Sequence, residues 1–190
     1  MTILAAEPDI YPPDLLDLPA DPTRGRCWWC LHTKPRQEKQ AARVLRKRAL
    51  PHYLPSVDHV SHTPNGRKIR SRLPLFPGYL FLFSDEYERV EATKGGHLAN
   101  VLAVYDQDEI QGDLRQIQRL LNSGLTVKAE PSIPVGAVVQ VSSGPLEGLR
   151  GTVVRRQGRD EFVAVVRFLG RGATIELADW QVERVDDRRG

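Results

Sequence analysis

The stretch Leu73-Pro74-Leu75-Phe76-Pro77-Gly78-Tyr79-Leu80-Phe81-Leu82-Phe83 decides the fold. Its two prolines exclude a helix at the start, because proline lacks an amide hydrogen and its ring clashes with the preceding turn. Gly78 permits a sharp turn of the backbone. A strand over the rest would place the aromatic rings on one face and the leucines on the other. Both faces are apolar, so we predict a central strand covered on both sides, either by the chain itself or on one side by a partner.

Charge is segregated along the chain. The 190 residues, 41% of them hydrophobic, suffice for one or two domains, and the formal net charge is +3. Residues 24–73 hold thirteen lysines and arginines against two acids, whereas residues 1–23 hold five acids and neither basic type. A basic block of this kind indicates a phosphate-rich partner such as nucleic acid. The alternative is a solvated charged face.

The termini and the cysteines exclude several classes of protein. The sequence has no apolar run of membrane-spanning length and no signal-peptide pattern, so we expect a cytoplasmic protein that does not associate with membranes. The pair Cys27 and Cys30 lies in a predicted strand, where residues three apart point to opposite faces. We therefore expect two buried thiols rather than a redox or zinc site, and we expect no metal and no cofactor.

The order of the predicted elements shows how the basic residues are displayed. Residues 1–23 are rich in proline and acids and are predicted to form a disordered tail. A helix starting at Pro35 and running to about Ala49 should bury its alanines and Leu45 and present its basic side chains together. Asn65-Gly66 predicts a two-residue hairpin turn with a basic second arm. Ser84 and Asp113 are predicted to cap two later helices.

The composition changes after a linker predicted at residues 125–134. Short valine-rich runs at 138–141, 152–156, 162–168 and 174–177 are separated by turn residues and predict a small all-β barrel. The histidines lack nearby paired carboxylates, and the spacing of Gly144 and Gly148 lacks the end of a phosphate loop. We therefore expect no catalytic residues and a protein that is not an enzyme.

Two motifs carry a resemblance to a known family. The order of aromatic strand, basic helix, basic hairpin, Phe76-Pro77-Gly78-Tyr79-Leu80-Phe81 and the run Ala92–Gly96 resembles the NusG N-terminal (NGN) domain. The run Gly144–Val153 resembles a KOW motif, and Phe168-Leu169-Gly170-Arg171 resembles the end of the KOW domain. The resemblance covers roughly residues 27–186.

This resemblance implies a fold and a function. The fold class would be α+β, with an NGN α/β sandwich on an antiparallel sheet at 24–124 and an SH3-like KOW barrel at 135–186. The protein would be a monomeric transcription elongation or antitermination factor that binds the clamp helices of RNA polymerase and favours processive elongation. Non-template DNA in the elongation complex would be a second partner, and a ribosomal protein or Rho would bind the KOW domain.

The resemblance also implies site residues. It places the polymerase-binding pocket at Tyr79, Phe81, His32, Phe76, Ile117 and Leu121, although a core role remains an alternative for Ile117 and Leu121. It places the nucleic-acid contact at Lys34, Arg36, Lys39, Arg43 and Lys94. It places the C-terminal partner site at Phe168, Leu169 and Arg171.

Two departures from housekeeping NusG indicate a specialised paralogue of the RfaH sort, which acts on selected operons. Leu169 stands where an aromatic residue is usual, and the first helix and hairpin are unusually basic. The alternatives are a housekeeping NusG, a KOW-type RNA-binding or ribosome-associated protein, and an enzyme that uses the histidines.

Overall fold

The computed structural model describes residues 7–18, 25–131, 135–144, 146–156, 159–176 and 182–185. The chain forms two compact units, residues 1–107 and 108–190. No helix among the described residues is long and apolar enough to cross a membrane.

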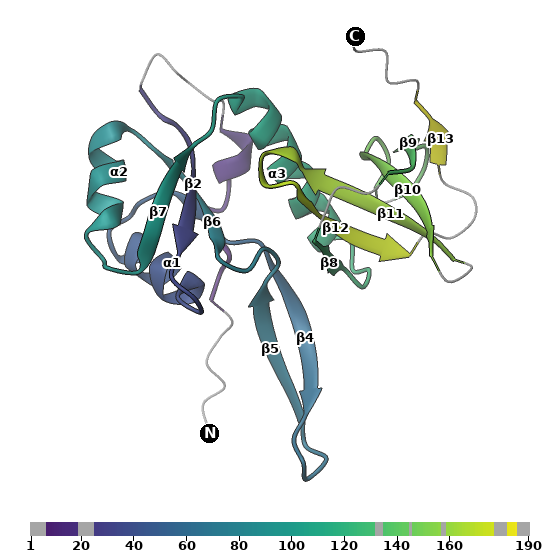
Figure 1. Ribbon diagram of the computed structural model, residues 1–190, viewed down its shortest axis with the longest axis horizontal. Coiled ribbons are helices and arrows are strands. Elements are labelled where there is room, and N and C mark those ends of the chain that lie inside the picture. Colours follow the sequence, from purple (N-terminus) through teal and green to yellow (C-terminus); the bar gives the residue numbers. More distant parts are fainter. Residues whose placement is uncertain are drawn as a thin grey trace. The chain divides into compact units, whose positions relative to one another are not determined.

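The first unit is built on a five-stranded antiparallel sheet (Figure 1). Its order is β1-β3-β6-β2-β7. The predicted central strand is confirmed, since β6 lies between β3 and β2 and its last five residues are all buried. The bounds are β1 Ile10–Tyr11, β2 Cys27–Thr33, β3 His52–Tyr53, β6 Tyr79–Ser84 and β7 Leu98–Ala103.

Helices α1 (Glu38–Lys47) and α2 (Glu86–Thr93) cover one face of this sheet (Figure 1). Ala41 and Leu45 of α1 share a buried cluster with Leu80 and Leu82 of β6. Alternation along β6 therefore directs the leucines toward the helices and the aromatic rings toward the opposite face, as the sequence predicts.

The predicted starts of α1 and α2 were wrong. Pro35 precedes a turn, in which Gln37 N–H donates to the carbonyl of Lys34, and Arg36 has a φ of 61°. The helix begins only at Glu38, because that left-handed residue interrupts helical geometry. Helix α2 is capped by Asp85 rather than Ser84, since the Asp85 carboxylate accepts from Glu88 N–H and completes a capping box.

The acidic N-terminal segment is ordered where the structure describes it, so the prediction of a disordered tail was wrong for residues 7–18. Strand β1 pairs with β3, and the 3₁₀ helix η1 (Leu15–Asp17) buries Leu15 and Leu16 completely or nearly so. Burial of these apolar side chains supplies the free energy that the polar composition lacks. Residues 1–6 and 19–23 lie outside the described residues.

Strands β4 (Ser56–His62) and β5 (Lys68–Pro74) form a separate two-stranded antiparallel hairpin that projects from the first unit (Figure 1). Its turn differs from the two-residue prediction. Thr63 N–H donates to the carbonyl of Arg67, so the loop has three residues, Pro64 to Gly66. The two-residue turn requires a positive φ at both Asn65 and Gly66, whereas only Gly66 has one, at 75°.

The second unit contains α3 (Gln107–Leu121), of which all but the first residue belongs to it, and a six-stranded antiparallel sheet of order β13-β9-β10-β11-β12-β8. The predicted valine-rich strands are present. The bounds are β8 Lys128–Glu130, β9 Ala137–Val141, β10 Arg150–Arg156, β11 Arg159–Val166, β12 Arg171–Glu176 and β13 Val182–Arg184, with a 3₁₀ helix η3 at Arg167–Leu169.

Two predictions about this region need correction. Asp113 lies within α3 and is buried, where its carboxylate accepts from Arg167 N–H at 2.9 Å, so it does not cap the helix. Lys128–Glu130, inside the predicted linker, pairs with β12 and belongs to the sheet. Both differences depend on partners more than 40 residues away in sequence.

Candidate functional site

Three hydrogen bonds to the backbone of the Phe76–Tyr79 turn hold it in place. Tyr79 N–H donates to the carbonyl of Phe76 at 3.0 Å, and Thr33 N–H donates to the carbonyl of Gly78 at 2.8 Å. Gly78 N–H donates to the carboxylate of Glu38 at 2.8 Å, which ties the turn to α1. Gly78 has a φ of 87°, a conformation that suits glycine after proline in a tight turn.

His32 and Tyr79 form a stacked pair where this turn enters the sheet. They are directly opposed on β2 and β6, and their ring centroids lie 5.1 Å apart with 22° between the planes. Both residues are half-buried, and they lie on the face opposite to α1 and α2. The pair therefore presents an aromatic surface that remains partly accessible.

The other predicted pocket residues are less accessible. Phe76 and Phe81 are 1% and 0% exposed and meet edge to face, with centroids 6.5 Å apart. Ile117 and Leu121 belong to α3 in the second unit, where Ile117 is buried and Leu121 half-buried. The structure therefore brings His32 to Tyr79 and Phe76 to Phe81, with Ile117 and Leu121 in the other unit.

The predicted nucleic-acid residues fall into two groups. Lys34 and Arg36 are exposed in the turn before α1, and Lys39 is half-buried in its first turn. No ion pair links these three to an acid within the part of the chain that the structure describes. By contrast, Arg43 pairs with Glu7 at 2.8 Å, and Lys94 pairs with Glu91.

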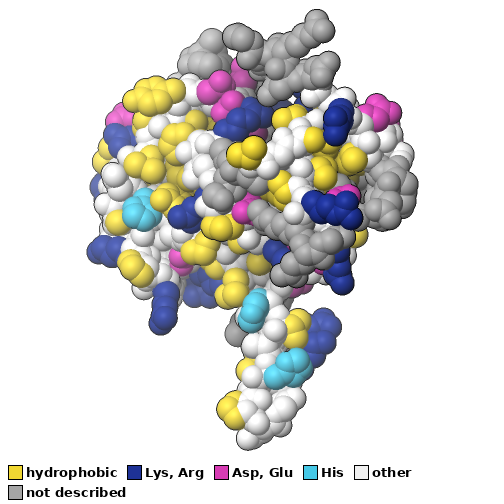
Figure 2. All heavy atoms as spheres, turned by 45° about the vertical axis from the view of Figure 1, so that its right-hand side comes forward, with side chains coloured by type: hydrophobic (Ala, Val, Ile, Leu, Met, Phe, Trp, Pro, Cys, Tyr) yellow, Lys and Arg dark blue, Asp and Glu magenta, His cyan; other side chains and the backbone are white. Residues whose placement is uncertain are grey.

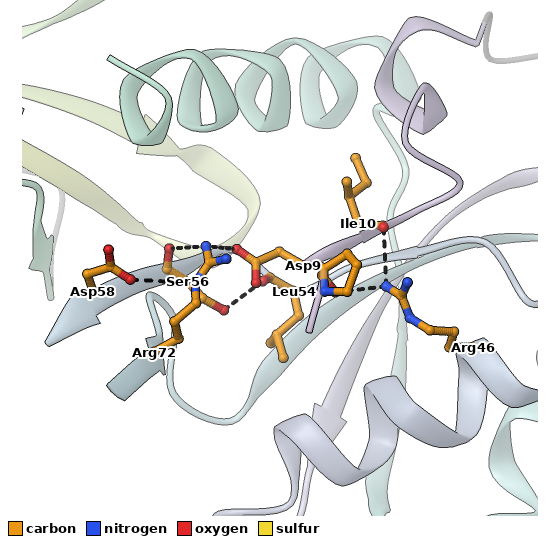
Figure 3. A network of polar contacts seen from close by, with 8 residues as sticks. Asp9, Ile10, Arg46, Leu54, Ser56, Asp58 and Arg72 are labelled. Carbon is orange, nitrogen blue, oxygen red and sulfur yellow. Dashed lines mark hydrogen bonds and ion pairs between the residues drawn. The ribbon is translucent and has the colours of Figure 1, made fainter. Parts of the chain in front are cut away.

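A polar network joins the N-terminal segment to α1 and to the base of the hairpin (Figure 3). Arg46 donates to the carbonyls of Pro8 and Ile10, at 2.8 and 3.2 Å. The Asp9 carboxylate pairs with Arg72 on β5, and Leu54 N–H donates to the Asp9 carbonyl at 2.7 Å. The root of the hairpin is thereby held by the N-terminal segment.

Asp9 and His52 are buried titratable groups beside this network. Burial raises the pKa of Asp9 from 3.8 to about 6, although the Arg72 guanidinium acts in the opposite direction. Burial lowers the pKa of His52 from 6.5 to about 4. The His52 Nδ1 lies 2.8 Å from the carbonyl of Leu50, while its buried Nε2 has no hydrogen-bond partner among the residues that the structure describes. His52 is therefore accommodated as a neutral ring.

The predicted C-terminal site residues lie close together in sequence and structure. Phe168 and Leu169 belong to η3, and Arg171 starts β12 after Gly170, whose φ is 61°. All three site residues are half-buried. The backbone N–H of Arg167, which begins η3, donates to Asp113, so α3 fixes the start of this segment.

The prediction of two buried thiols is confirmed for Cys30 but not for Cys27. Cys30 is buried and Cys27 half-buried, and neither forms a disulfide. Burial raises the pKa of both thiols, that of Cys30 to about 12. Thiolate chemistry is therefore disfavoured at both residues.

Sequence reasoning missed two residues that organise the site, Glu38 and Asp9. Glu38 was one of only two acids in the basic block, which is a signal that an acid has a specific partner. Its partner, Gly78 N–H, is 40 residues away. Asp9 had no such signal, because it was one of five acids in a segment predicted to be disordered.

Comparison with known proteins gives a family match. Residues 26–106 match the NusG family, described as transcription termination factor nusG. The transcription termination/antitermination protein NusG of Thermus thermophilus is 30% identical over 178 residues, which cover 82% of this chain and 96% of the relative.

Two solved structures are similar over most of the chain. One, described as domain interaction in Thermotoga maritima NusG, has a TM-score of 0.46 and 21% identity, and covers 85% of this chain and 98% of its own. The other, described as the crystal structure of the MjSpt4:Spt5 complex in conformation A, has a TM-score of 0.29 and 18% identity. The match covers 83% of this chain and 97% of the other chain. The family assignment rests on the sequence identity with the Thermus protein and not on these two structural similarities.

Proposed function

Because the chain belongs to the NusG family of transcription termination and antitermination factors, we propose that it binds the clamp helices of RNA polymerase and favours processive elongation. The observation that carries this proposal is the half-buried His32–Tyr79 stack, which is held by a turn fixed at three backbone positions. Aromatic side chains on a rigid element are typical anchors of protein interfaces. A factor that binds the closed state of the clamp more tightly shifts polymerase toward that state.

The basic residues near this pair favour a second contact, with non-template DNA. Lys34 follows His32 by two residues, and Arg36 and Lys39 come next in the chain. Their exposure or partial exposure leaves their charges available for phosphates. Arg43 and Lys94 are part of the same proposed contact, but each must exchange an existing carboxylate partner for a phosphate.

We also infer that residues 24–124 are an NGN domain and that residues 135–186 are a KOW domain with an SH3-like barrel. Short antiparallel strands, of which β9, β10, β11 and β12 pair with one another in the order of the sequence, support this assignment. Phe168, Leu169 and Arg171 are its proposed contacts with a ribosomal protein or Rho. The segregated basic block and Leu169 favour a specialised, RfaH-like factor for selected operons over a general one.

Co-sedimentation with core RNA polymerase tests the proposal. We expect the chain to sediment with the enzyme, and a variant with His32→Ala and Tyr79→Ala to lose affinity by on the order of 1–3 kcal/mol. Tyr87→Ala is the matched control, because Tyr87 lies on α2 and is 74% exposed. An unchanged affinity of the folded double variant would contradict the proposed site.

A further inference from the structure

The β4–β5 hairpin has two chemically different faces. Directly opposed residues of an antiparallel pair point to the same side, and neighbours along a strand alternate. The pairing of Val60 with Arg70 and of His62 with Lys68 therefore places these four side chains on one face with Asp58 and Arg72. The ion pair between Arg72 and Asp58, at 3.8 Å, agrees with this assignment. The other face carries Val57, His59, Ser61, Ile69, Ser71 and Leu73.

The cations on the first face form a regular row. Lys68, Arg70 and Arg72 occupy alternate positions of β5, so successive charges advance by about 6.6–6.8 Å along the strand. Arg72, at the root, is neutralised by Asp9 and Asp58. Lys68 and Arg70 are exposed, and no ion pair joins either to an acid among the residues that the structure describes. The outer half of the arm thus carries the unneutralised charge.

Hydrogen bonds at both ends of the hairpin and an ion pair at its root fix the orientation of this row of cations. At the tip, the Thr63 hydroxyl accepts from Arg67 N–H at 3.0 Å, and Gly66 N–H donates to the Thr63 carbonyl at 2.9 Å. At the root, Asp9 holds Arg72, and Leu75 N–H donates to the carbonyl of Pro55 at 2.7 Å. Figure 2 shows the arm standing out from the body with basic and histidine side chains along it.

We propose that this hairpin is a DNA arm, which lies along the backbone of duplex DNA with Lys68 and Arg70 on phosphates. Each strand of B-DNA carries one phosphate per about 3.4 Å of axis, and because the strand winds around that axis, neighbouring phosphates along the backbone lie roughly twice as far apart, which is close to the spacing of the cations. The major groove of B-DNA admits a two-stranded ribbon, whereas that of A-form RNA is too narrow. Contacts of this kind position the protein without reading sequence.

This surface is distinct from the proposed polymerase and non-template contacts. Its test therefore uses the full-length chain and a duplex DNA of about 25 base pairs without polymerase. Fluorescence anisotropy over a series of salt concentrations gives the affinity and its salt dependence. A duplex RNA and a single-stranded DNA of the same sequence serve as competing ligands.

The informative variant carries Lys68→Gln and Arg70→Gln, and its control carries Ser61→Glu and Ser71→Glu on the opposite face. Both variants lower the net charge by two, so the comparison separates a local contact from a general effect of charge. We expect the first to flatten the salt slope by about 1.8, at about 0.9 per phosphate contact, and to weaken binding at least tenfold at low salt. The control should keep the slope of the unmodified chain.

Three results would overturn the proposal. One is an equal loss of affinity in both variants, which would indicate net charge alone. Another is a loss of affinity for the duplex RNA or the single strand in the glutamine variant that is as large as its loss of affinity for duplex DNA. The third is unchanged DNA binding by the glutamine variant with loss of binding to isolated polymerase, which would make the arm a protein-docking element. Circular dichroism of each variant establishes that the fold is retained.

Discussion

The carboxylate of Glu38 accepts a hydrogen bond from the backbone N–H of Gly78 at 2.8 Å. This single bond fixes the first turn of the basic helix α1 to the turn that enters β6. It therefore sets the position of the proposed DNA contact, around Lys34 to Lys39, relative to the proposed polymerase contact at His32 and Tyr79.

Glu38→Ala tests this connection. The substitution leaves the Gly78 N–H without its acceptor, so we expect a loss of about 1–3 kcal/mol in the free energy of unfolding. Glu38→Gln retains an oxygen acceptor and should recover much of that loss. Urea denaturation of the three proteins gives the comparison. Equal unfolding midpoints for the alanine variant and the unmodified chain would show that this hydrogen bond contributes nothing to the stability of the fold.

Tyr79 and Phe81 should separate binding from stability. Phe81 is fully buried, so Phe81→Ala should lower the free energy of unfolding by about 3–5 kcal/mol. Tyr79 is half-buried at the end of the strand, and Tyr79→Ala should cost much less stability. Thermal unfolding of both variants checks the order. If Tyr79→Ala is as destabilising as Phe81→Ala, Tyr79 is a core residue rather than an accessible anchor.

The fold was predictable where the determining pattern was local. The alternation from Tyr79 to Phe83 identified the central strand, and the valine-rich runs identified the second sheet. That the segment around Leu15 and Leu16 is ordered could not be predicted from its polar composition. Its stability comes from the burial of these two side chains in the folded protein. Local rules also chose Asp113 as a cap, whereas its actual partner is the Arg167 amide, 54 residues away.

The same limit applied to the site. Sequence identified His32 and Tyr79 separately through the resemblance, but only the strand register shows that they stack. Sequence also treated Arg36 as a helical residue, whereas its φ of 61° places it in the preceding turn.

The pH dependence of stability should reveal His52 and Asp9 as opposing groups. The folded state keeps His52 neutral, so protonation of the unfolded chain lowers stability as the pH falls from about 6.5 to about 4. The raised pKa of Asp9 acts oppositely, because the stability that it contributes is present near pH 4 and is lost as the pH rises to about 6. Each pKa unit corresponds to about 1.4 kcal/mol.

Two variants separate these contributions. Asp9→Asn should make the loss of stability on acidification steeper, because the opposing group is gone. His52→Phe should flatten or reverse that loss. Unfolding free energies from pH 4 to pH 7 provide the measurement, and parallel curves for all three proteins would show that neither group is coupled to folding.

Gly172 should be required by the second sheet. An added Cβ there would lie 2.4 Å from the carbonyl oxygen of Ala164, so Gly172→Ala must displace β11 from β12. We expect a loss of at least about 1–3 kcal/mol. Gly112→Ala in α3 is the control, because nothing lies within 4 Å of its added Cβ and alanine favours a helix by about 1 kcal/mol. Hydrogen exchange of the second unit would reveal the difference, and equal protection would contradict this strand pairing.

Photo-crosslinking from position 79 in a complex with RNA polymerase tests most directly whether the His32–Tyr79 stack binds the clamp helices. Benzoylphenylalanine in place of Tyr79 puts a reactive ring at the proposed interface, and the same group in place of Tyr87 on α2 is the control. We expect position 79 to crosslink to the clamp helices and position 87 not to crosslink to them. A bound complex in which position 79 crosslinks elsewhere, or in which both positions react equally, would contradict this proposal.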